Sequence, residues 1–391
     1  MSSVPQVSTV LPEDPSARLI GRVAVQGEAP IPVLLHENAV YDLHSLAPTV
    51  SGLLEREDLG ELFRDTSRLT HLCGIESLGS EEGDSAEFTL VSPIDLQVVK
   101  ACGVTFVESM LERLVEERSH GDPARAEKFR TEIASGSIGG ETLKLSEIKS
   151  GSPEALTIRQ RLMEQGLWSQ YLEVGLGPDP EVFTKAPILS SVGTLSAIGV
   201  SRMSNWSNPE PELVLVITSQ GEIVGATLGN DVNLRDVEGR SALLLGRAKD
   251  NNRSTAIGPF IRLFDETFTL DDARAMEIHL SVKGSDGFEL QGSNAVSRIS
   301  RPFEELVQAT WGDHHQYPDG FVLFTGTLFA PTDDRGEAGA GFTHHMGDVV
   351  TIESEELGAL VNTVGRSEEA APWEYGVGDL FRDLLKRYQQ I

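Results

Sequence analysis

The sequence has only two cysteines, Cys73 and Cys102, in 391 residues. Two cysteines cannot support a fold based on several disulfides, and they are too few for a metal site built from cysteine ligands. Cysteine is among the residues most often buried in folded proteins. We therefore expect both to be buried free thiols in a reducing compartment.

Positive charge is also scarce. The chain has 32 Lys and Arg against 60 Asp and Glu, which gives a formal net charge of -28 with His neutral. Binding to nucleic acid or to an anionic membrane surface depends on a surplus of Lys and Arg on some face of the protein. The composition therefore predicts that the chain has neither nucleic acid nor a membrane as its partner.

Long hydrophobic runs and targeting signals are missing as well. No apolar run approaches the ~18 residues of a transmembrane helix, and residues 1–5 show neither the basic nor the apolar segment of a signal peptide. Hydrophobic residues nevertheless make up 39% of the chain, which is enough for a packed core. We therefore expect a globular protein of the cytoplasm.

The pattern of the first hundred residues predicts a small α+β domain over residues 1–94, of which residues 1–17, mostly Ser, Pro and Val, form a loose arm. A helical pattern covers residues 49–66. Short apolar runs separated by turn residues predict strands. These runs are residues 23–25, 31–35 and 38–43.

Residues 95–391 form the second predicted domain, in which helical patterns come first and strand-like patterns follow. Apolar residues at helical spacing predict helices at 106–115 and 159–171, and the polar stretch 117–152, broken by glycines, predicts an insert. The predicted strands are residues 214–217, 223–227, 277–282 and 349–352, and further helices are predicted at 303–311 and over the apolar stripe Leu380, Phe381, Leu384, Leu385 and Tyr388.

Two glutamates stand at the entrance to an apolar strand, in the segment Pro209-Glu210-Pro211-Glu212-Leu213. Because side chains alternate along a strand, Glu210 and Glu212 share one face. Like charges on one face repel each other unless a cation lies between them. A hard divalent ion is the simplest such cation, although acidic pairs at strand ends are more often solvated surface residues.

A third acid, Asp231, follows the next predicted strand, and residues 219–222 between the two strands suit a hairpin turn. In an antiparallel hairpin the end of the second strand returns to the start of the first, so we expect Asp231 close to Glu212. Three carboxylates with positions left for water or substrate suit Mg²⁺ or Mn²⁺ better than Zn²⁺.

The sequence resembles the fumarylacetoacetate hydrolase superfamily over roughly residues 100–365. The resemblance rests on segments 209–213 and 229–236, which contain the three acids, and on Lys249 ahead of Gly258-Pro259. The remaining matching segments are 101–106, 180–185, 324–327, 341–343, 347–348 and 357–362. The combination is specific to the superfamily, whereas any one of these motifs alone would not be.

The resemblance implies an α+β fold with a mixed β-roll catalytic core. It also implies Mg²⁺, with Mn²⁺ or Ca²⁺ as alternatives, held by residues that match the family's ligands at Glu210, Glu212 and Asp231. Lys249 matches the family's active-site lysine, and Thr327 matches its substrate-binding threonine. Substrates in the superfamily are usually 2-oxo or 1,3-dicarbonyl acids, so a small 2-keto acid is the expected substrate.

The superfamily contains C–C hydrolases and dehydratases, so the fold does not fix the reaction. The hydrolase members activate water with a histidine and a glutamate, and these positions are matched here by Ser109 and Glu112. A hydroxyl without an adjacent base activates water poorly. His120 has the wrong spacing to replace the missing histidine, and His314-His315 and His344-His345 are more often structural or surface residues.

Segment 209–213, the motif Lys185-Ala186-Pro187 and the Ser109/Arg113 pattern resemble most closely the sugar-acid dehydratases of the superfamily. That branch converts a 2-keto-3-deoxypentonate, derived from D-arabinonate or D-xylonate, to 2-oxoglutarate semialdehyde, and Asp250-Asn251-Asn252 is a departure from its usual pattern. The resemblance implies Lys249, Glu112 and Thr327 as catalytic residues. The implied substrate-binding residues are Ser109, Arg235, Lys185 and Gly326.

Two other functions stay open from the sequence. One is a C–C hydrolase of acylpyruvates or 2,4-diketo-3-deoxy sugar acids, and the other is a non-catalytic binding protein on the same scaffold. Retention of Glu210, Glu212, Asp231 and Lys249 argues against the binding protein. The family implies a homodimer or homotetramer, with which the C-terminal apolar stripe is compatible.

Overall fold

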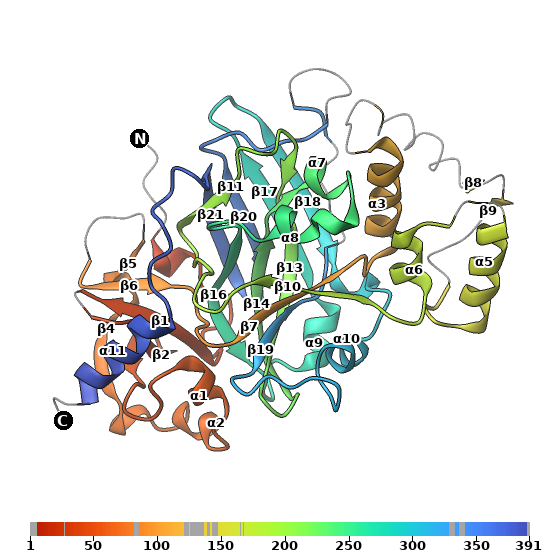
Figure 1. The fold of residues 1–391 in the computed structure, drawn as a ribbon. Coiled ribbons are helices and arrows are strands. Elements are labelled where there is room, and N and C mark those ends of the chain that lie inside the picture. Colours follow the sequence, from red (N-terminus) through yellow and green to blue (C-terminus); the bar gives the residue numbers. More distant parts are fainter. Residues whose placement is uncertain are drawn as a thin grey trace.

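A computed structural model describes residues 6–26, 28–81, 86–120, 125, 137–138, 141–142, 148–164, 166, 168–327, 333–335 and 341–388. Two mixed sheets form the body of the molecule, with helices around them (Figure 1). The fold is therefore α+β, as the sequence predicts.

The larger sheet contains the two strands, β13 (Pro211–Ile217) and β14 (Ile223–Asp231), at whose ends the three acidic residues lie. Its path in order of pairing is β10 (Glu181–Ala186), β7 (Val98–Gly103), β19 (Phe321–Phe324), β13, β14, β16 (Thr255–Leu263), β1 (Leu19–Val25), β2 (Ile31–His36), β3 (Ala39–Asp42) and β4 (Thr70–Gly74). β6 (Phe88–Val91) also pairs with β1, and β5 (Leu78–Ser80) pairs with β6.

A second sheet packs against the first. It consists of β11 (Ser196–Val200), β21 (Gly358–Arg366), β20 (Val349–Ser354), β17 (Glu277–Lys283) and β18 (Glu289–Ala295). Four short strands form two further pairs in the described part of the chain: β12 (Ser207–Asn208) pairs with β15 (Asn233–Leu234), and β8 (Ser137–Ile138) pairs with β9 (Glu141–Thr142).

Helices surround the two sheets and cluster at both ends of the molecule. α3 (Val107–Ser119), α5 (Pro153–Glu164) and α6 (Gln170–Leu176) lie at one end, and α1 (Val50–Leu54), α2 (Leu59–Leu62) and α11 (Val377–Tyr388) lie at the other (Figure 1). The other α-helices in the described part of the chain are α7 (Arg235–Glu238), α8 (Leu245–Lys249), α9 (Leu270–Ala275) and α10 (Phe303–Thr310).

β13 is buried on both faces, which explains the unbroken apolar run in its sequence. Leu213, Leu215 and Ile217 belong to the core that also contains Ile278 and Leu280 of β17. Val214 and Val216 face the opposite side and join the core formed with α1 and β16. The strand that follows Glu210 is therefore held rigidly from two directions.

The boundary predicted near residue 94 lies within a continuous region of structure. β1, from the N-terminal part, pairs with β16 in the register Leu19↔Arg262 and Ile20↔Ile261. The division of the chain into domains 1–94 and 95–391 stays a prediction.

The sequence favours a loose arm over residues 1–17, whereas the structure shows this segment packed from Gln6 onward. Val7 and Val10 are buried in the core that contains Ala359. The Ala359 N–H donates to the Val10 carbonyl at 2.9 Å, and Arg262 pairs with Asp14 at 2.6 Å. These apolar and charged contacts outweigh the flexibility that the composition suggests.

Two of the predicted helices are shorter than their patterns. The helical pattern at 49–66 is divided between α1 and α2, and glycines at 52 and 60 lower the helix propensity of this stretch. The pattern at 159–171 is divided between α5 and α6 by Gly166, whose positive φ of 68° suits the residue after a helix end. Most of the predicted insert at 117–152 lies outside the described residues.

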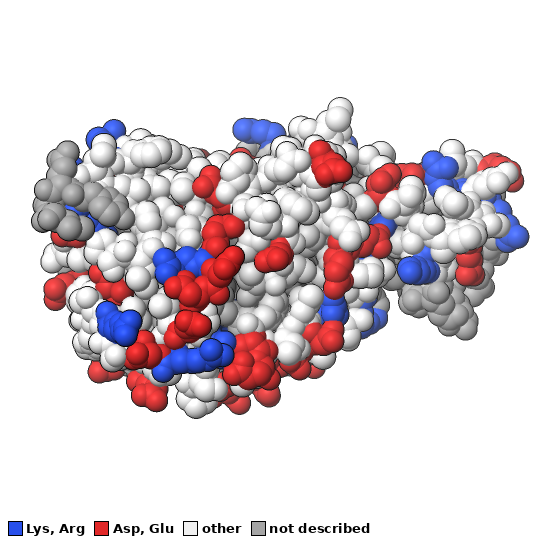
Figure 2. Space-filling model, turned by 90° about the horizontal axis from the view of Figure 1, so that it is seen from below, with Lys and Arg blue, Asp and Glu red and all other residues white. Residues whose placement is uncertain are grey.

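Acidic side chains are spread over the face seen from below, with Lys and Arg lying among them (Figure 2). In the part of the chain that the structure describes, no helix is long and apolar enough to cross a bilayer. Cys73 and Cys102 are both buried free thiols, as predicted.

Candidate metal centre and catalytic cavity

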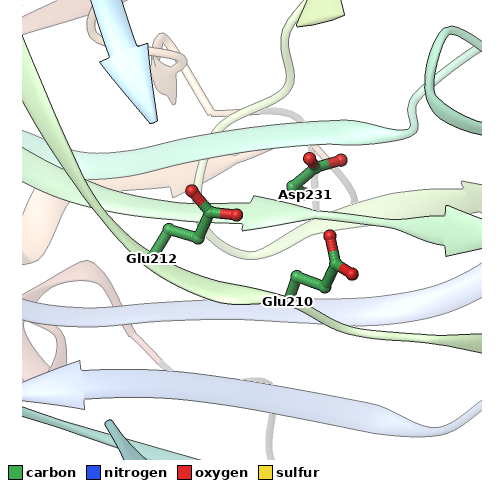
Figure 3. A group of neighbouring side chains, drawn as sticks. All are labelled: Glu210, Glu212 and Asp231. Carbon is green, nitrogen blue, oxygen red and sulfur yellow. The ribbon is translucent and has the colours of Figure 1, made fainter. Parts of the chain in front are cut away.

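The hairpin of β13 and β14 brings the three predicted metal ligands together. Pro211 pairs with Asn230, and the Asp231 N–H donates to the Glu210 carbonyl at 3.1 Å. One carboxylate oxygen from each of Glu210, Glu212 and Asp231 lies within 4.8 Å of the others, and the three side chains converge (Figure 3). The sequence argument that the hairpin returns Asp231 to the start of the first strand is confirmed.

Among the described residues, three cations contact this acidic cluster. Lys249 forms a salt bridge with Glu210, and its Nζ lies 3.0 Å from Asp231 Oδ2. Lys185 Nζ lies 3.2 Å from Asp231 Oδ1, and Arg113 bonds Glu210. The cluster is therefore partly neutralised by the chain itself.

Glu212 differs from the other two acids because its described partner is a backbone N–H group. Its Oε2 accepts a hydrogen bond from the Gly326 N–H at 2.7 Å. Burial, followed by the negative charges of Asp231 and Glu210, raises the pKa of Glu212 well above its usual range. The direction of this shift agrees with repulsion among the three carboxylates in a buried site.

The described charges around the cavity favour binding of a divalent cation. Five carboxylates lie here, because Glu181 and Glu238 line the same cavity as the three acids. Lys249, Lys185 and Arg113 supply three positive charges. Among these described groups the carboxylates outnumber the cations even with Glu181 protonated, so a bound cation would offset an excess of negative charge. Oxygen-only donors are the ligands of hard ions such as Mg²⁺, so the residues present fit the predicted metal.

One cavity collects most of the residues predicted for the site. Ser109, Lys249, Gly326 and Thr327 line it together with the three acids. The Ser109 hydroxyl donates to the Phe106 carbonyl of its own helix at 3.0 Å. Substrate binding by these side chains stays a prediction, but their common location is a property of the structure.

Gly326 occupies a place that no other residue would fit. Its φ is +95°, and a Cβ built on it would lie 1.9 Å from Thr105 Oγ1. The close approach permitted by glycine is therefore to Thr105, and the Gly326 N–H is engaged by Glu212. The predicted contact of Gly326 with a substrate carboxylate stays untested.

Lys185 and Arg235 are not among the residues lining the cavity. The Lys185 side chain is 0% exposed, and its ammonium donates to the Ser254 carbonyl at 3.0 Å as well as to the Lys249 carbonyl. Arg235 is buried with its guanidinium 4.3 Å from the Trp206 ring centroid. Their predicted contact with substrate stays a prediction.

Glu112, the predicted acid for the leaving group, belongs to α3, but its side chain lies outside the described residues. Its predicted role is therefore also untested.

Three further charged residues line the cavity, namely Glu181, Arg113 and Glu238, and the sequence analysis assigned none of them to the site. Glu181 lies on β10, where period two places it on the same face as Phe183 of the cavity wall. Burial raises the pKa of the partly buried Glu181 carboxyl, which favours its protonated form. Arg113 lies four residues after Ser109 on α3, and its Nη1 is 2.8 Å from Glu238 Oε2. The helical spacing of Ser109 and Arg113 is the signal that could have placed Arg113 in the cavity.

None of the described residues that line the cavity is a histidine. His120 and His314 are exposed. His344 is buried against Phe342, with ring centroids 5.2 Å apart, and its Nδ1 lies 3.5 Å from Asp348. His345 is exposed beside Asp286. These histidines have the structural or surface locations that the sequence favours for them.

A family model described as fumarylacetoacetate (FAA) hydrolase C-terminal matches residues 156–365. The chain belongs to the fumarylacetoacetate hydrolase family. The resemblance seen in the sequence and the predicted fold class are thereby confirmed.

Among family members, a probable 2-keto-3-deoxyxylonate dehydratase of Haloferax volcanii is 30% identical over 283 residues, covering 72% of this chain and 90% of that protein. A 2-dehydro-3-deoxy-D-arabinonate dehydratase of Saccharolobus solfataricus is 34% identical over 185 residues, covering 47% of this chain and 58% of that protein. Both relatives are hydro-lyases by name, and the prediction that the chain is an enzyme is confirmed.

A solved structure of 2-keto-3-deoxy-D-arabinonate dehydratase complexed with magnesium and 2,5-dioxopentanoate has a TM-score of 0.58 to this chain. Its sequence is 23% identical, and the likeness covers 89% of this chain and 99% of that one. At this identity the likeness bears on the fold alone.

Proposed function

We propose that this family member is a dehydratase that depends on a divalent metal and converts a 2-keto-3-deoxypentonate to 2-oxoglutarate semialdehyde. The observation that carries the proposal is the cavity in which Glu210, Glu212 and Asp231 converge beside Lys249. Support for the substrate class comes from the two relatives, which are named for 2-keto-3-deoxy sugar acids.

Glu210, Glu212 and Asp231 would hold the ion, with Mg²⁺ as the first candidate and Mn²⁺ or Ca²⁺ as alternatives. When bound, the ion supplies an electrophile that polarises the 2-keto group and acidifies the C3 protons. Dehydration then needs a base for one C3 proton and an acid for the C4 hydroxyl, which leaves as water. Proton shifts convert the unsaturated keto acid that remains into the aldehyde.

Lys249 is the basic group that reaches the acids from α8. Burial alone would lower the pKa of Lys249, but the carboxylates of Asp231 and Glu210 outweigh it and raise the pKa. A metal ion sharing those carboxylates would weaken their hold on the ammonium. Two roles fit this location, namely removal of the C3 proton and binding of the substrate carboxylate as a cation.

The K249R and K249M variants distinguish these two roles. Arginine keeps the positive charge but does not give up its proton near neutral pH, because its pKa exceeds ~12. A proton-transfer role predicts that both variants are inactive. A purely cationic role predicts that K249R retains much more activity than K249M.

Two carboxyl groups are candidates for the acid that protonates the leaving hydroxyl. Glu112 is the residue implied by the family resemblance. Glu181 lies at the cavity, and burial raises the pKa of its carboxyl group, as a general acid requires. Loss of turnover in only one of E112Q and E181Q would assign the role.

Thr327 and Ser109, with hydroxyl groups in the cavity wall, would bind the carboxylate and hydroxyl groups of the substrate. The backbone at Gly326 would hold Thr327 in place. Lys185 and Arg235, which the sequence resemblance assigns to the substrate, would act from behind the cavity wall through Asp231 and Trp206.

The proposal is tested by supplying 2-keto-3-deoxypentonate and, separately, an acylpyruvate, each with Mg²⁺ or with EDTA. The proposal predicts an aldehyde product from the sugar acid, lost with EDTA and restored by Mg²⁺. Release of pyruvate from acylpyruvate without dehydration of the sugar acid would instead support C–C hydrolysis. Absence of turnover on both, with metal bound, would support a binding protein.

The place of the reaction in sugar-acid breakdown, a cytoplasmic location and a homodimer or homotetramer belong to the same proposal. A small 2-keto acid is its expected partner. Size measurement in solution with light scattering tests the oligomer directly, and a monomeric active enzyme would contradict it.

A further inference from the structure

Arg113 connects the helical end of the molecule to the acidic cluster. It lies in α3, whose apolar side packs with α6 through Met110 and Leu114. From the other side of the helix the guanidinium of Arg113 bonds Glu210 and lies 2.8 Å from Glu238 Oε2.

These charges are well shielded from solvent. The side chains of Arg113, Glu238 and Glu210 are 12%, 6% and 3% exposed. Ion pairs in such surroundings are screened much less than surface pairs. The two contacts of Arg113 therefore constrain the position of its partners more than a surface ion pair would.

The Glu210 carboxylate is the most extensively held of the three acids. Its Oε1 contacts Arg113 and accepts from Asn233 Nδ2 at 3.2 Å, while its Oε2 contacts Lys249. Asn233 and Lys249 come from β15 and α8, next to the hairpin in sequence, whereas Arg113 comes from α3. Residues that contact a metal ligand from behind fix its orientation and affect metal affinity.

We propose that Arg113 is a positioning residue for the metal ligand Glu210 and that Glu238 is the counter-charge that holds Arg113 in place. The inference rests on the metal centre of the proposed function. Because its guanidinium is engaged by two carboxylates, Arg113 acts through Glu210 and not as the anchor of the substrate carboxylate. Glu238 and Arg113 thereby link α7 and α3 to the metal centre.

The test uses the full chain and four variants, R113K, R113M, E238Q and the double variant R113M/E238Q. Metal binding is measured by isothermal titration calorimetry with Mn²⁺ alone and Mg²⁺ alone, without substrate. Thermal unfolding of the same samples reports stability. R202M is the control, because Arg202 and its partner Glu369 form an ion pair at the surface, 61% and 63% exposed.

The double variant separates geometry from charge and from folding. R113M alone leaves Glu238 buried without its partner Arg113 and should lower Tm. R113M/E238Q removes one charge of each sign, so the net charge near Glu210 is unchanged and Tm should recover. We expect metal affinity to stay roughly 10- to 100-fold weaker in both, with a smaller loss in R113K and none in R202M.

Activity supplies a second readout. With metal saturating, KM of R113M/E238Q for the 2-keto-3-deoxypentonate should be little changed, because Arg113 acts on a metal ligand and not on the substrate. A large rise in KM with unchanged metal affinity would overturn the inference and make Arg113 a substrate ligand.

Recovery of metal affinity together with Tm in R113M/E238Q would also overturn the inference, since Arg113 would then serve the fold only. If the wild type itself binds neither Mn²⁺ nor Mg²⁺, the proposed metal centre fails. If the wild type binds metal and the variants bind it equally well, the metal centre stands and only the positioning role of Arg113 is refuted.

Discussion

Replacement of Gly326 by alanine adds one carbon atom, the Cβ, to the wall of the cavity. The added Cβ would lie 1.9 Å from Thr105 Oγ1 and 3.3 Å from the Cys102 carbonyl oxygen, at a backbone φ of +95°. The Gly326 N–H also donates to Glu212 at 2.7 Å, so any shift of this backbone is transmitted to a proposed metal ligand.

The magnitude follows from two separate costs. A side chain at positive φ costs about 1–2 kcal/mol, and overpacking costs typically about 1–3 kcal/mol. The G326A variant should therefore lose about 2–5 kcal/mol of unfolding free energy from the two costs together. Metal affinity should fall as well, because the shifted Gly326 N–H would no longer point at the Glu212 carboxylate.

Gly347 provides the matched control. Its φ is +89°, close to that of Gly326, but nothing lies within 4 Å of the Cβ that alanine would add. G347A should show only the backbone cost of about 1–2 kcal/mol and unchanged metal affinity. Urea unfolding and calorimetric titration with Mn²⁺ measure both quantities.

A second substitution tests the contact itself. T105A removes the Oγ1 atom that the new Cβ would meet, although it also removes the hydrogen bond from Thr105 to the Thr325 carbonyl at 2.7 Å. T105A alone should destabilise by about 1 kcal/mol, yet it should be neutral or stabilising in the G326A background. Equal losses in G326A and G347A would refute the reasoning, and so would simple additivity of T105A and G326A.

Three further predictions follow from single side chains. E212Q should abolish turnover and weaken Mg²⁺ binding because it removes one of the three charges around the ion; an active variant with normal metal affinity would eliminate Glu212 as a ligand. K185M should cost about 3–5 kcal/mol in urea unfolding, because it breaks a buried ion pair from one side, whereas a loss below that of a surface variant would show that Lys185 does not support Asp231. For Asp348, burial alone would raise the pKa, but its hydrogen bonds and the Arg335 guanidinium lower it. A carboxyl group with a lowered folded-state pKa stabilises above its unfolded value of about 4 and loses this contribution as pH falls toward the folded value. The stability difference between wild type and D348N should therefore be largest near neutral pH and shrink below about pH 4, and a difference independent of pH would contradict the assigned cause.

The sequence predicted the acidic hairpin because its geometry is local. Alternation fixes the faces of Glu210 and Glu212, and a short turn at 219–222 fixes where Asp231 returns. The same reasoning works wherever two neighbouring segments pair directly. It explains why β2 and β14 begin at their predicted residues and why β1, which begins four residues earlier than predicted, ends at its predicted residue.

Non-local pairing was beyond the reach of the sequence patterns. β16 runs from Thr255 to Leu263 and contains Gly258-Pro259, a pair that reads as a turn in a single sequence. In the structure β16 is nevertheless the strand that joins β14 to β1, and its register with β14 shifts near Gly258. Only the pairing partners, which lie far apart along the chain, explain why this segment is extended.

Arg113 shows a related limit at the site, because its spacing from Ser109 indicates a shared helix face but not what that face meets. The amphipathic pattern of residues 106–115 assigns it to the polar side of a helix, where arginines usually face solvent. The structure directs it into the cavity because Glu210 and Glu238, from two other elements, meet there. Lys185 is the reverse case. The sequence resemblance assigns it to the substrate, whereas in the structure its ammonium group is fully buried behind Asp231.

The proposed dehydration of a 2-keto-3-deoxypentonate, supported by a divalent ion at Glu210, Glu212 and Asp231, changes the mass of the substrate. Mass spectrometry of the product formed with Mg²⁺, compared with the EDTA-treated protein and with E212Q, tests it most directly. Metal-dependent dehydration predicts a product lighter than the substrate by one molecule of water, formed only by the wild type with metal. The same product formed equally fast with EDTA or by E212Q, or cleavage of the substrate into two fragments, would contradict it.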